Sequence, residues 1–117
     1  MLSDKIKNQI MKIIFRHIDK DDCAVFLFGS FARRSERRAS DIDIGILCKT
    51  PVKKSTLYLL REELEEEVYT LRKIDLVDFS DVKDKLFLKE VFKEVQIWHM
   101  GSQLQTTFQT LKEHMQI

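Results

Sequence analysis

The sequence contains few residues that break secondary structure: one proline and three glycines among 117 residues. It also lacks an excess of charge, because 20 basic and 19 acidic side chains leave a formal net charge of +1. We therefore do not expect charge alone to recruit nucleic acid or a membrane. No apolar run approaches the roughly 20 residues of a membrane span, and residues 1–10 lack the apolar centre of a secretory signal. These absences predict a soluble, cytoplasmic protein.

Cysteine is equally scarce. Cys23 and Cys48 lie beside apolar strand residues and match no metal-ligand spacing. We expect reduced thiols that contribute to packing, as is usual in cytosolic proteins. The chain is long enough for one hydrophobic core, so residues 1–100 are predicted to form one domain. Apolar residues at helical spacing after Gly101 predict a C-terminal helix over 101–117 that docks on this domain or on a partner.

Apolar periodicity in the rest of the chain alternates between helix and strand patterns. Helices are predicted over residues 3–17, 54–70 and 83–94. Strands are predicted over residues 23–28, 41–48, 73–79 and 95–99, the last at a sheet edge. The expected fold class is α+β, a small mixed sheet of about four strands flanked by helices.

Residues 25–47 join two apolar strands through a Gly-Ser step and a polar loop. Residues 24–28 have no polar side chain, as in a strand buried on both faces. Gly29 permits a tight turn and Ser30 can cap a helix. The N-terminus of such a helix presents backbone N–H groups and the positive end of the helix dipole. This stretch therefore predicts a phosphate-binding turn.

Two aspartates follow that loop. Asp41 and Asp43 alternate with isoleucines, and a period of two places both carboxylates on one strand face, roughly 6.5 Å apart between Cα atoms. This face would repel bound phosphates unless divalent cations lie between them. Mg²⁺ takes that position with one or two carboxylates and phosphate oxygens as ligands, so the pair predicts a magnesium site beside the phosphate-binding turn.

A third carboxylate, Asp75, lies inside the apolar strand predicted over 73–79. A carboxylate in such a place costs several kcal/mol unless it is paired or bound to metal. Asp78 is nearer the strand end and is more readily explained by contact with solvent. We therefore choose Asp75 as the third acid. The acidic run 62–67 is interpreted as a solvated helix face.

The order of these motifs resembles the signature of the polymerase-beta-type nucleotidyltransferase superfamily, most closely its minimal single-domain branch. That signature has a Gly-Ser step, a gap of about ten residues, an Asp-x-Asp pair and a third acid on a neighbouring strand. Residues 31–33, Phe-Ala-Arg, are also similar to the family's aromatic-Ala-Arg continuation, and Ser40 before the acid pair matches its usual Ser-Asp-x-Asp. The resemblance covers roughly residues 24–98 and implies a palm-like nucleotidyltransferase fold.

The resemblance also implies roles for individual residues. It assigns the nucleotide to Gly29, Ser30, Arg33 and Ser40, and it assigns two Mg²⁺ ions and the catalysis to Asp41, Asp43 and Asp75. The branch is best known as the antitoxin partner of HEPN-domain ribonuclease toxins. The implied reaction transfers AMP from ATP to a hydroxyl of that toxin, the hydroxyl of a tyrosine. We also expect that the chain can form a homo-oligomer or a hetero-oligomer.

Three alternatives stay open from the sequence. The chain could be a non-catalytic antitoxin that neutralises its toxin by binding, or a nucleotidyltransferase that modifies a small molecule such as a drug. RNA binding through the arginines of residues 33–38 is a third and weaker hypothesis. A glycosyltransferase, which also uses Asp-x-Asp with a metal, is disfavoured because 117 residues leave no room for a sugar-nucleotide domain.

Overall fold

The computed structural model describes residues 2–29 and 41–104. Ser30, Arg33 and Ser40, predicted to bind nucleotide, and most of the predicted C-terminal helix lie outside these residues. Within the described part the chain forms three helices and four strands. In chain order they are α1 (Asp4–Ile14), β1 (Cys23–Phe28), β2 (Ile42–Cys48), α3 (Lys54–Glu67), β3 (Ile74–Asp78), α4 (Lys85–Phe92) and β4 (Gln96–Met100).

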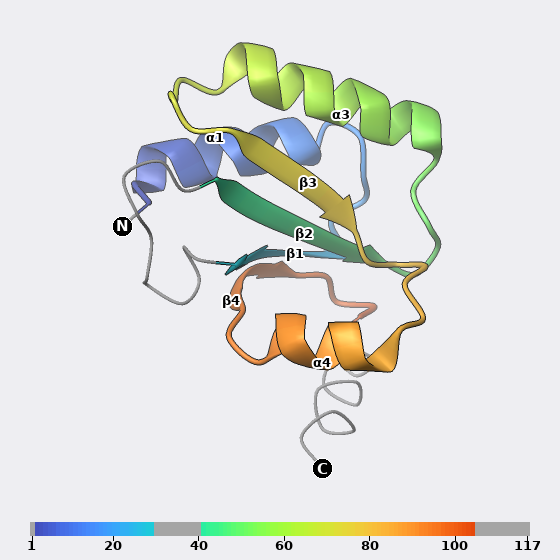
Figure 1. The fold of residues 1–117 in the computed structure, drawn as a ribbon. Coiled ribbons are helices and arrows are strands. Elements are labelled where there is room, and N and C mark those ends of the chain that lie inside the picture. The colour runs from blue at the N-terminus through green and yellow to red at the C-terminus, as the bar shows by residue number, and fades with distance from the viewer. Residues whose placement is uncertain (1, 30–40, 105–117) are drawn as a thin grey trace.

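The four described strands form one mixed sheet in the order β3-β2-β1-β4 (Figure 1). β1 pairs antiparallel with β2 and with β4, whereas β2 and β3 run parallel. A parallel pair needs a crossover connection, and α3 provides it. β3 and β4 are the two edges of the sheet. The predicted α+β class, the number of strands and the edge position of the last strand are confirmed.

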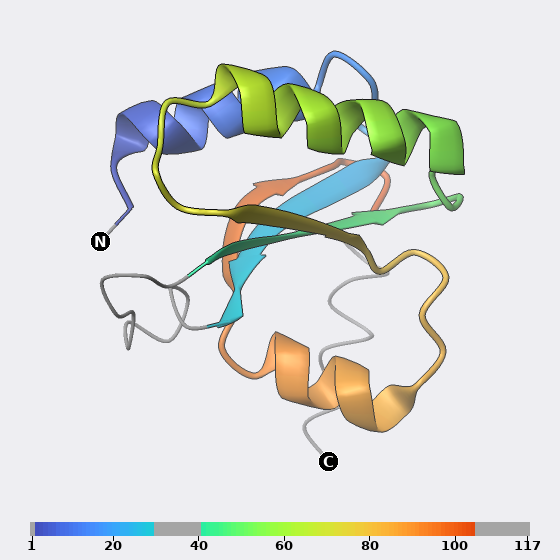
Figure 2. The ribbon, with the colours of Figure 1, turned by 45° about the horizontal axis from the view of Figure 1, so that its top comes forward.

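Helices cover both faces of the sheet (Figure 2). α1 and α3 lie on one face and enclose a mainly aliphatic core, while α4 lies on the other face over Phe26 and Phe79. In β2 the residues Ile42 and Ile44 are fully buried against α1 and α3. Because strand side chains alternate, Asp43 between them faces the α4 side. Leu104 is also buried on that side, so the chain after β4 returns to the body of the protein.

The helix boundaries follow from their caps. Ser3 accepts a hydrogen bond from the Ile6 amide at 3.3 Å, and this fixes the start of α1. Asp84 caps α4 in the same way, which makes this helix shorter than the predicted 83–94. α3 ends three residues before its predicted end because Val68 adopts an extended backbone, with φ −81° and ψ 124°.

The acidic run of α3 is more than a solvated face, which corrects the sequence interpretation. Arg16, just after α1, donates hydrogen bonds at 2.9 Å to Glu63 and to Glu67. His17 also contacts Glu63. The hydrogen bond from Arg16 holds the pKa of Glu67 below its ordinary value. These pairs join α3 to the segment after α1 on the aliphatic side of the sheet.

Cys23 and Cys48 form a disulfide. They are direct partners in the β1–β2 ladder, with Cα atoms 4.0 Å apart. The expectation of reduced thiols is therefore wrong, because strand pairing brings together two residues that are 25 positions apart. The disulfide lies at the end of the β1–β2 pair opposite Phe28 and Asp43. None of the described helices has the length and apolar character that a membrane crossing requires.

Candidate active site

The turn after β1 lies against the first carboxylate of the site. Phe28 and Asp43 are direct partners in the antiparallel ladder, and Gly29 follows with φ 75°. A Cβ atom added at Gly29 would lie 2.2 Å from Oδ2 of Asp43. Glycine is therefore required at this position both for the left-handed backbone and for the space beside the carboxylate. The turn predicted to bind phosphate thus touches one of the predicted metal ligands.

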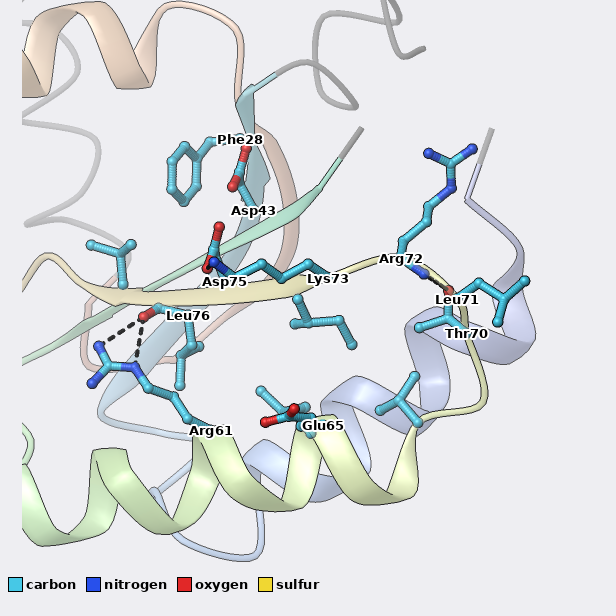
Figure 3. A pocket seen from close by; sticks show the side chains of 14 residues that line it. Phe28, Asp43, Arg61, Glu65, Thr70, Leu71, Arg72, Lys73, Asp75 and Leu76 are labelled. Carbon is cyan, nitrogen blue, oxygen red and sulfur yellow. Dashed lines mark hydrogen bonds and ion pairs between the residues drawn. The ribbon is translucent and has the colours of Figure 1, made fainter. Parts of the chain in front are cut away.

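Asp43 and Asp75 face each other across two parallel strands. They are direct register partners in the β2–β3 pair, and their carboxylates lie on the same side of the sheet (Figure 3). Both residues are half-buried. Lys73 lies immediately before β3, two residues before Asp75, and its Nζ is 3.5 Å from Oδ1 of Asp75. This cation offsets part of the repulsion between the two carboxylates.

Asp41 lies immediately before β2 and is exposed. The amide of Ile42 donates a hydrogen bond of 2.8 Å to the carbonyl of Lys73, which holds this end of β2 against β3. Asp41 does not line the pocket that contains Asp43 and Asp75. The structure brings Gly29, Asp43 and Asp75 together, and it places Asp41 two residues from Asp43 along the chain.

Asp78, which was not chosen as the third acid from the sequence, has a structural role. Its carboxylate accepts hydrogen bonds of 3.0 Å from the amides of Val52 and Ser80. The Ser80 hydroxyl in turn accepts from the Cys48 amide at 2.8 Å. Asp78 is half-buried, so its explanation as a solvated residue is wrong. It connects the ends of β2 and β3 to the segment that leads into α3.

A pocket of about 800 Å³ opens at this site and extends along the edge strand β3 (Figure 3). On the α4 side it is lined by Phe28, Asp43 and Asp75. On the α3 side, Arg61 donates from Nε and Nη2 to the carbonyl of Leu76, at 3.2 and 2.9 Å. A smaller hollow of about 330 Å³ lies beside Gly29 and the end of α4.

The carboxylates of the site can be compared with the ligands that Mg²⁺ requires from a protein. Among residues 2–29 and 41–104 no group of three or more His, Cys, Asp or Glu side chains is arranged to hold a metal. Mg²⁺ requires less from the protein than this, because it is commonly held by one or two carboxylates together with substrate phosphates and water. Asp43 and Asp75, in register beside the Gly29 turn, fit such a shared site.

A family model described as polymerase beta, nucleotidyltransferase matches residues 6–100. The chain belongs to this family. The match includes every element that carries the site, from α1 to β4. The predicted family resemblance is therefore confirmed. Of the three predicted acids, Asp43 and Asp75 lie on neighbouring strands.

Two relatives with assigned names are similar in sequence to this chain. The protein adenylyltransferase MntA of Shewanella oneidensis is 28% identical over 92 residues, which cover 79% of this chain and 64% of that protein. A putative protein adenylyltransferase of Methanocaldococcus jannaschii is 30% identical over 92 residues, which cover 75% of this chain and 94% of that protein. The matched part of this nucleotidyltransferase thus spans less than two thirds of the Shewanella protein.

Solved structures share the fold. A crystal structure described as a toxin–antitoxin with AMP-PNP has a TM-score of 0.72 at 22% identity and covers 97% of this chain and 84% of that one. A structure of a tri-AMPylated Shewanella oneidensis HEPN toxin in complex with an MNT antitoxin has a TM-score of 0.67 at 21% identity, with 94% and 80% coverage. At these identities the likeness establishes the nucleotidyltransferase fold.

The sequence reasoning missed two residues at the site of this nucleotidyltransferase. Lys73 was not singled out, although it begins the strand predicted over residues 73–79, in which residues two positions apart share a face. Its contact with Asp75 is the one that this spacing predicts. Arg61 was missed because its contact with Leu76 depends on how α3 lies over the sheet edge. No sequence period within α3 distinguishes it from the other charged residues of that helix.

Proposed function

We propose that this nucleotidyltransferase transfers AMP from ATP to a tyrosine hydroxyl of a HEPN-domain protein. It would act as the antitoxin of that protein. The single observation that carries the proposal is the register of Asp43 and Asp75 beside the Gly29 turn. The names of the two relatives and the described neighbours support the nucleotide and the class of acceptor.

The Gly29 turn would hold the triphosphate. Its backbone approaches the Asp43 carboxylate closely because no side chain fills the space. A phosphate bound at this turn therefore lies beside the acids that must organise it. Ser30, Arg33 and Ser40 complete the nucleotide site in our proposal, with the guanidinium of Arg33 offsetting charge on the departing pyrophosphate.

Asp41, Asp43 and Asp75 would hold two Mg²⁺ ions shared with the triphosphate. When bound, these ions supply electrostatic stabilisation of the phosphates and acidify the attacking hydroxyl. The fit rests on the two carboxylates that face each other across β2 and β3. It also rests on the half-burial of both, which removes part of the water that would otherwise compete for the ligands.

Asp75 would accept the proton of the acceptor hydroxyl. The hydroxyl oxygen forms a bond to the α-phosphorus, the bond from that phosphorus to the bridging oxygen breaks, and pyrophosphate leaves with the electron pair. A carboxylate with an ordinary pKa of about 4 is a weak base. A tyrosine hydroxyl, with a pKa of about 10, loses its proton more readily than a sugar hydroxyl, so it is the acceptor that suits Asp75 best.

The test uses ATP labelled at the α-phosphate, Mg²⁺ and the HEPN-domain protein that we propose as the partner. We expect label on that protein with the wild type, loss of label with Asp43→Asn, and full labelling with the matched control Asp81→Asn, an exposed carboxylate outside the pocket. Absence of label with the wild type would contradict the enzymatic proposal. Neutralisation of the partner that survives Asp43→Asn would favour an antitoxin that acts by binding.

Two further parts of the proposal need their own measurements. The cytoplasmic location stays a prediction, and cell fractionation would test it. Because disulfides are rare in cytosolic proteins, the oxidation state of the Cys23–Cys48 pair in the cell bears on the same question. Assembly with the partner or with a second copy also stays a prediction, which light scattering of the mixed proteins would test.

A further inference from the structure

The site is a row of residues that crosses three adjacent strands. Phe28 on β1, Asp43 on β2 and Asp75 on β3 are successive register partners, and neighbouring strands lie about 4.8 Å apart. The Gly29 turn is at the β1 end of this row. Asp75 is at the other end, on the strand that forms the sheet edge among the described residues.

In-line transfer gives this row a direction. The attacking and leaving oxygens lie on opposite sides of the phosphorus. If the triphosphate is held at the Gly29 turn, pyrophosphate leaves towards β1 and the acceptor hydroxyl arrives from the side of Asp75. This step rests on the proposed function. The acceptor therefore has to approach across the free edge of β3.

The loop that leads into β3 carries two strongly exposed apolar side chains. This segment, residues 68–73, is called the approach loop below. Tyr69 has a relative exposure of 89% and Leu71 of 107%. Leu71 also lines the pocket that contains Asp43 and Asp75 (Figure 3). A single exposed apolar residue is common on protein surfaces, but these two lie in one short loop next to the pocket.

The pocket beside the approach loop also presents cations. Apart from the two site aspartates, the charged residues that line the pocket are three cations and one anion among the residues described. They are Arg61, Arg72 and Lys73 against Glu65. A partner surface that places carboxylates opposite these cations would be steered towards the site.

The edge of β3 is not open to simple strand addition. Exposed edges pair readily with another chain when their backbone groups are unoccupied, but the carbonyl of Leu76 already accepts two hydrogen bonds from Arg61. A partner is therefore held by side-chain contacts at the approach loop instead of by a backbone ladder along β3.

We propose that the approach loop is the docking surface for the protein acceptor. Tyr69 and Leu71 insert against an apolar patch on the partner, carboxylates around that patch face Arg61 and Arg72, and the acceptor hydroxyl passes over β3 to Asp75. The occupant is the protein that receives AMP, not the nucleotide and not a second copy of this chain.

The experiment compares two double variants with the wild type. Tyr69→Ser with Leu71→Ser removes the apolar contact. Tyr58→Ser with Leu86→Ser removes two other exposed residues, at 64% and 78%, that do not line the pocket. All four side chains are largely in solvent, so folding should be retained, and thermal unfolding checks this. The acceptor is the HEPN-domain protein proposed above as the partner.

We expect the approach-loop variant to raise KM for the acceptor protein by about tenfold or more, since central apolar contacts dominate interface energies. The Kd for the partner, measured without ATP, should rise by a similar factor, while the KM of this variant for ATP stays unchanged. The control variant should have wild-type values for all three constants. Wild-type kinetics and partner affinity in the approach-loop variant would overturn the inference. Absence of transfer by the wild type would contradict the proposed function instead, and the Kd measurement would still decide the docking surface.

Discussion

Asp43 and Asp75 lie opposite each other on parallel neighbouring strands, with both carboxylates on the α4 side of the sheet. Like charges placed directly across a sheet are unfavourable. Lys73, 3.5 Å from Asp75, offsets part of this cost. Two facing acids beside a tight turn are typical of a site that binds cations together with a charged substrate.

Asp75→Asn should separate function from stability. We expect AMP transfer to fall by about 100-fold or more, because the variant loses a metal ligand and the base. The free energy of unfolding should stay equal or rise, because one of two facing charges is removed. Transfer assays and urea unfolding of the same preparation measure both effects.

The matched comparison is Asp78→Ala, three residues further along the same strand. Here the amides of Val52 and Ser80 lose their acceptor, so stability should fall by about 1–3 kcal/mol while transfer per folded molecule is kept. Equal stability loss in both variants would contradict the separate roles of the two acids.

Gly29→Ala should damage the site more than the fold. The new Cβ would lie 2.2 Å from Oδ2 of Asp43, and the alanine would have to adopt a φ of 75°. We expect transfer to fall by about tenfold or more, because misplacement of a reacting group by even 1 Å is costly. Unfolding should become easier by about 1–2 kcal/mol from the left-handed backbone.

Gly45→Ala provides the control for that variant. Its Cβ would meet the ring of Phe26 at 2.2 Å, within the core on the α4 side. Overpacking of this kind lowers the free energy of unfolding by about 1–3 kcal/mol. The new methyl group makes no direct contact with Asp75, so this variant measures the effect of lost stability on transfer. A Gly29→Ala enzyme with wild-type transfer and wild-type KM for ATP would show that the turn does not touch the nucleotide.

Reduction of the Cys23–Cys48 disulfide should lower stability. The cysteines are 25 residues apart, and closing a loop of that length constrains the unfolded chain by about 3 kcal/mol. Urea unfolding with and without dithiothreitol measures the difference. The double variant Cys23→Ser with Cys48→Ser should be insensitive to dithiothreitol. An unfolding curve that is unchanged by reduction in the wild type would rule out the disulfide in solution.

The contact between Arg16 and Glu67 should make stability depend on pH. In the folded protein the hydrogen bond from Arg16 lowers the pKa of Glu67 below the ordinary value of 4.5. A lowered carboxyl pKa means that the stabilisation is complete above about pH 4.5 and is lost as the pH falls through the folded value. The pKa of Arg16 is raised, so this guanidinium keeps its charge throughout.

We therefore expect Arg16→Met to be less stable than the wild type at pH 7, with the difference shrinking as the pH is lowered below 4.5. Both side chains of the Arg16–Glu67 pair are more than 40% exposed, so the effect is small and screened by salt. Lys93→Met, which removes a more exposed ion pair with Glu90, is the control. A difference between wild type and Arg16→Met that stays constant from pH 7 to pH 3 would contradict this assignment.

The sequence by itself determined the local elements and the candidate chemistry. Apolar spacing is a property of a few consecutive residues, so strands and helices could be located to within about three residues, and β1 was predicted over the observed Cys23–Phe28. The Gly-Ser step and the Asp-x-Asp pair are equally local, so they could be recognised before the fold was known. The choice of Asp75 needed only the cost of a carboxylate in an apolar strand.

Only the tertiary structure decided which distant residues meet. The register that places Asp43 opposite Asp75, the pairing of Cys23 with Cys48 and the contact of Arg61 with Leu76 each join different elements. Such contacts depend on strand order, strand direction and helix placement, and these follow from how the whole core packs. The period of a single segment carries no information about its neighbours, which is why the disulfide was missed and the partners of Asp78 were not foreseen.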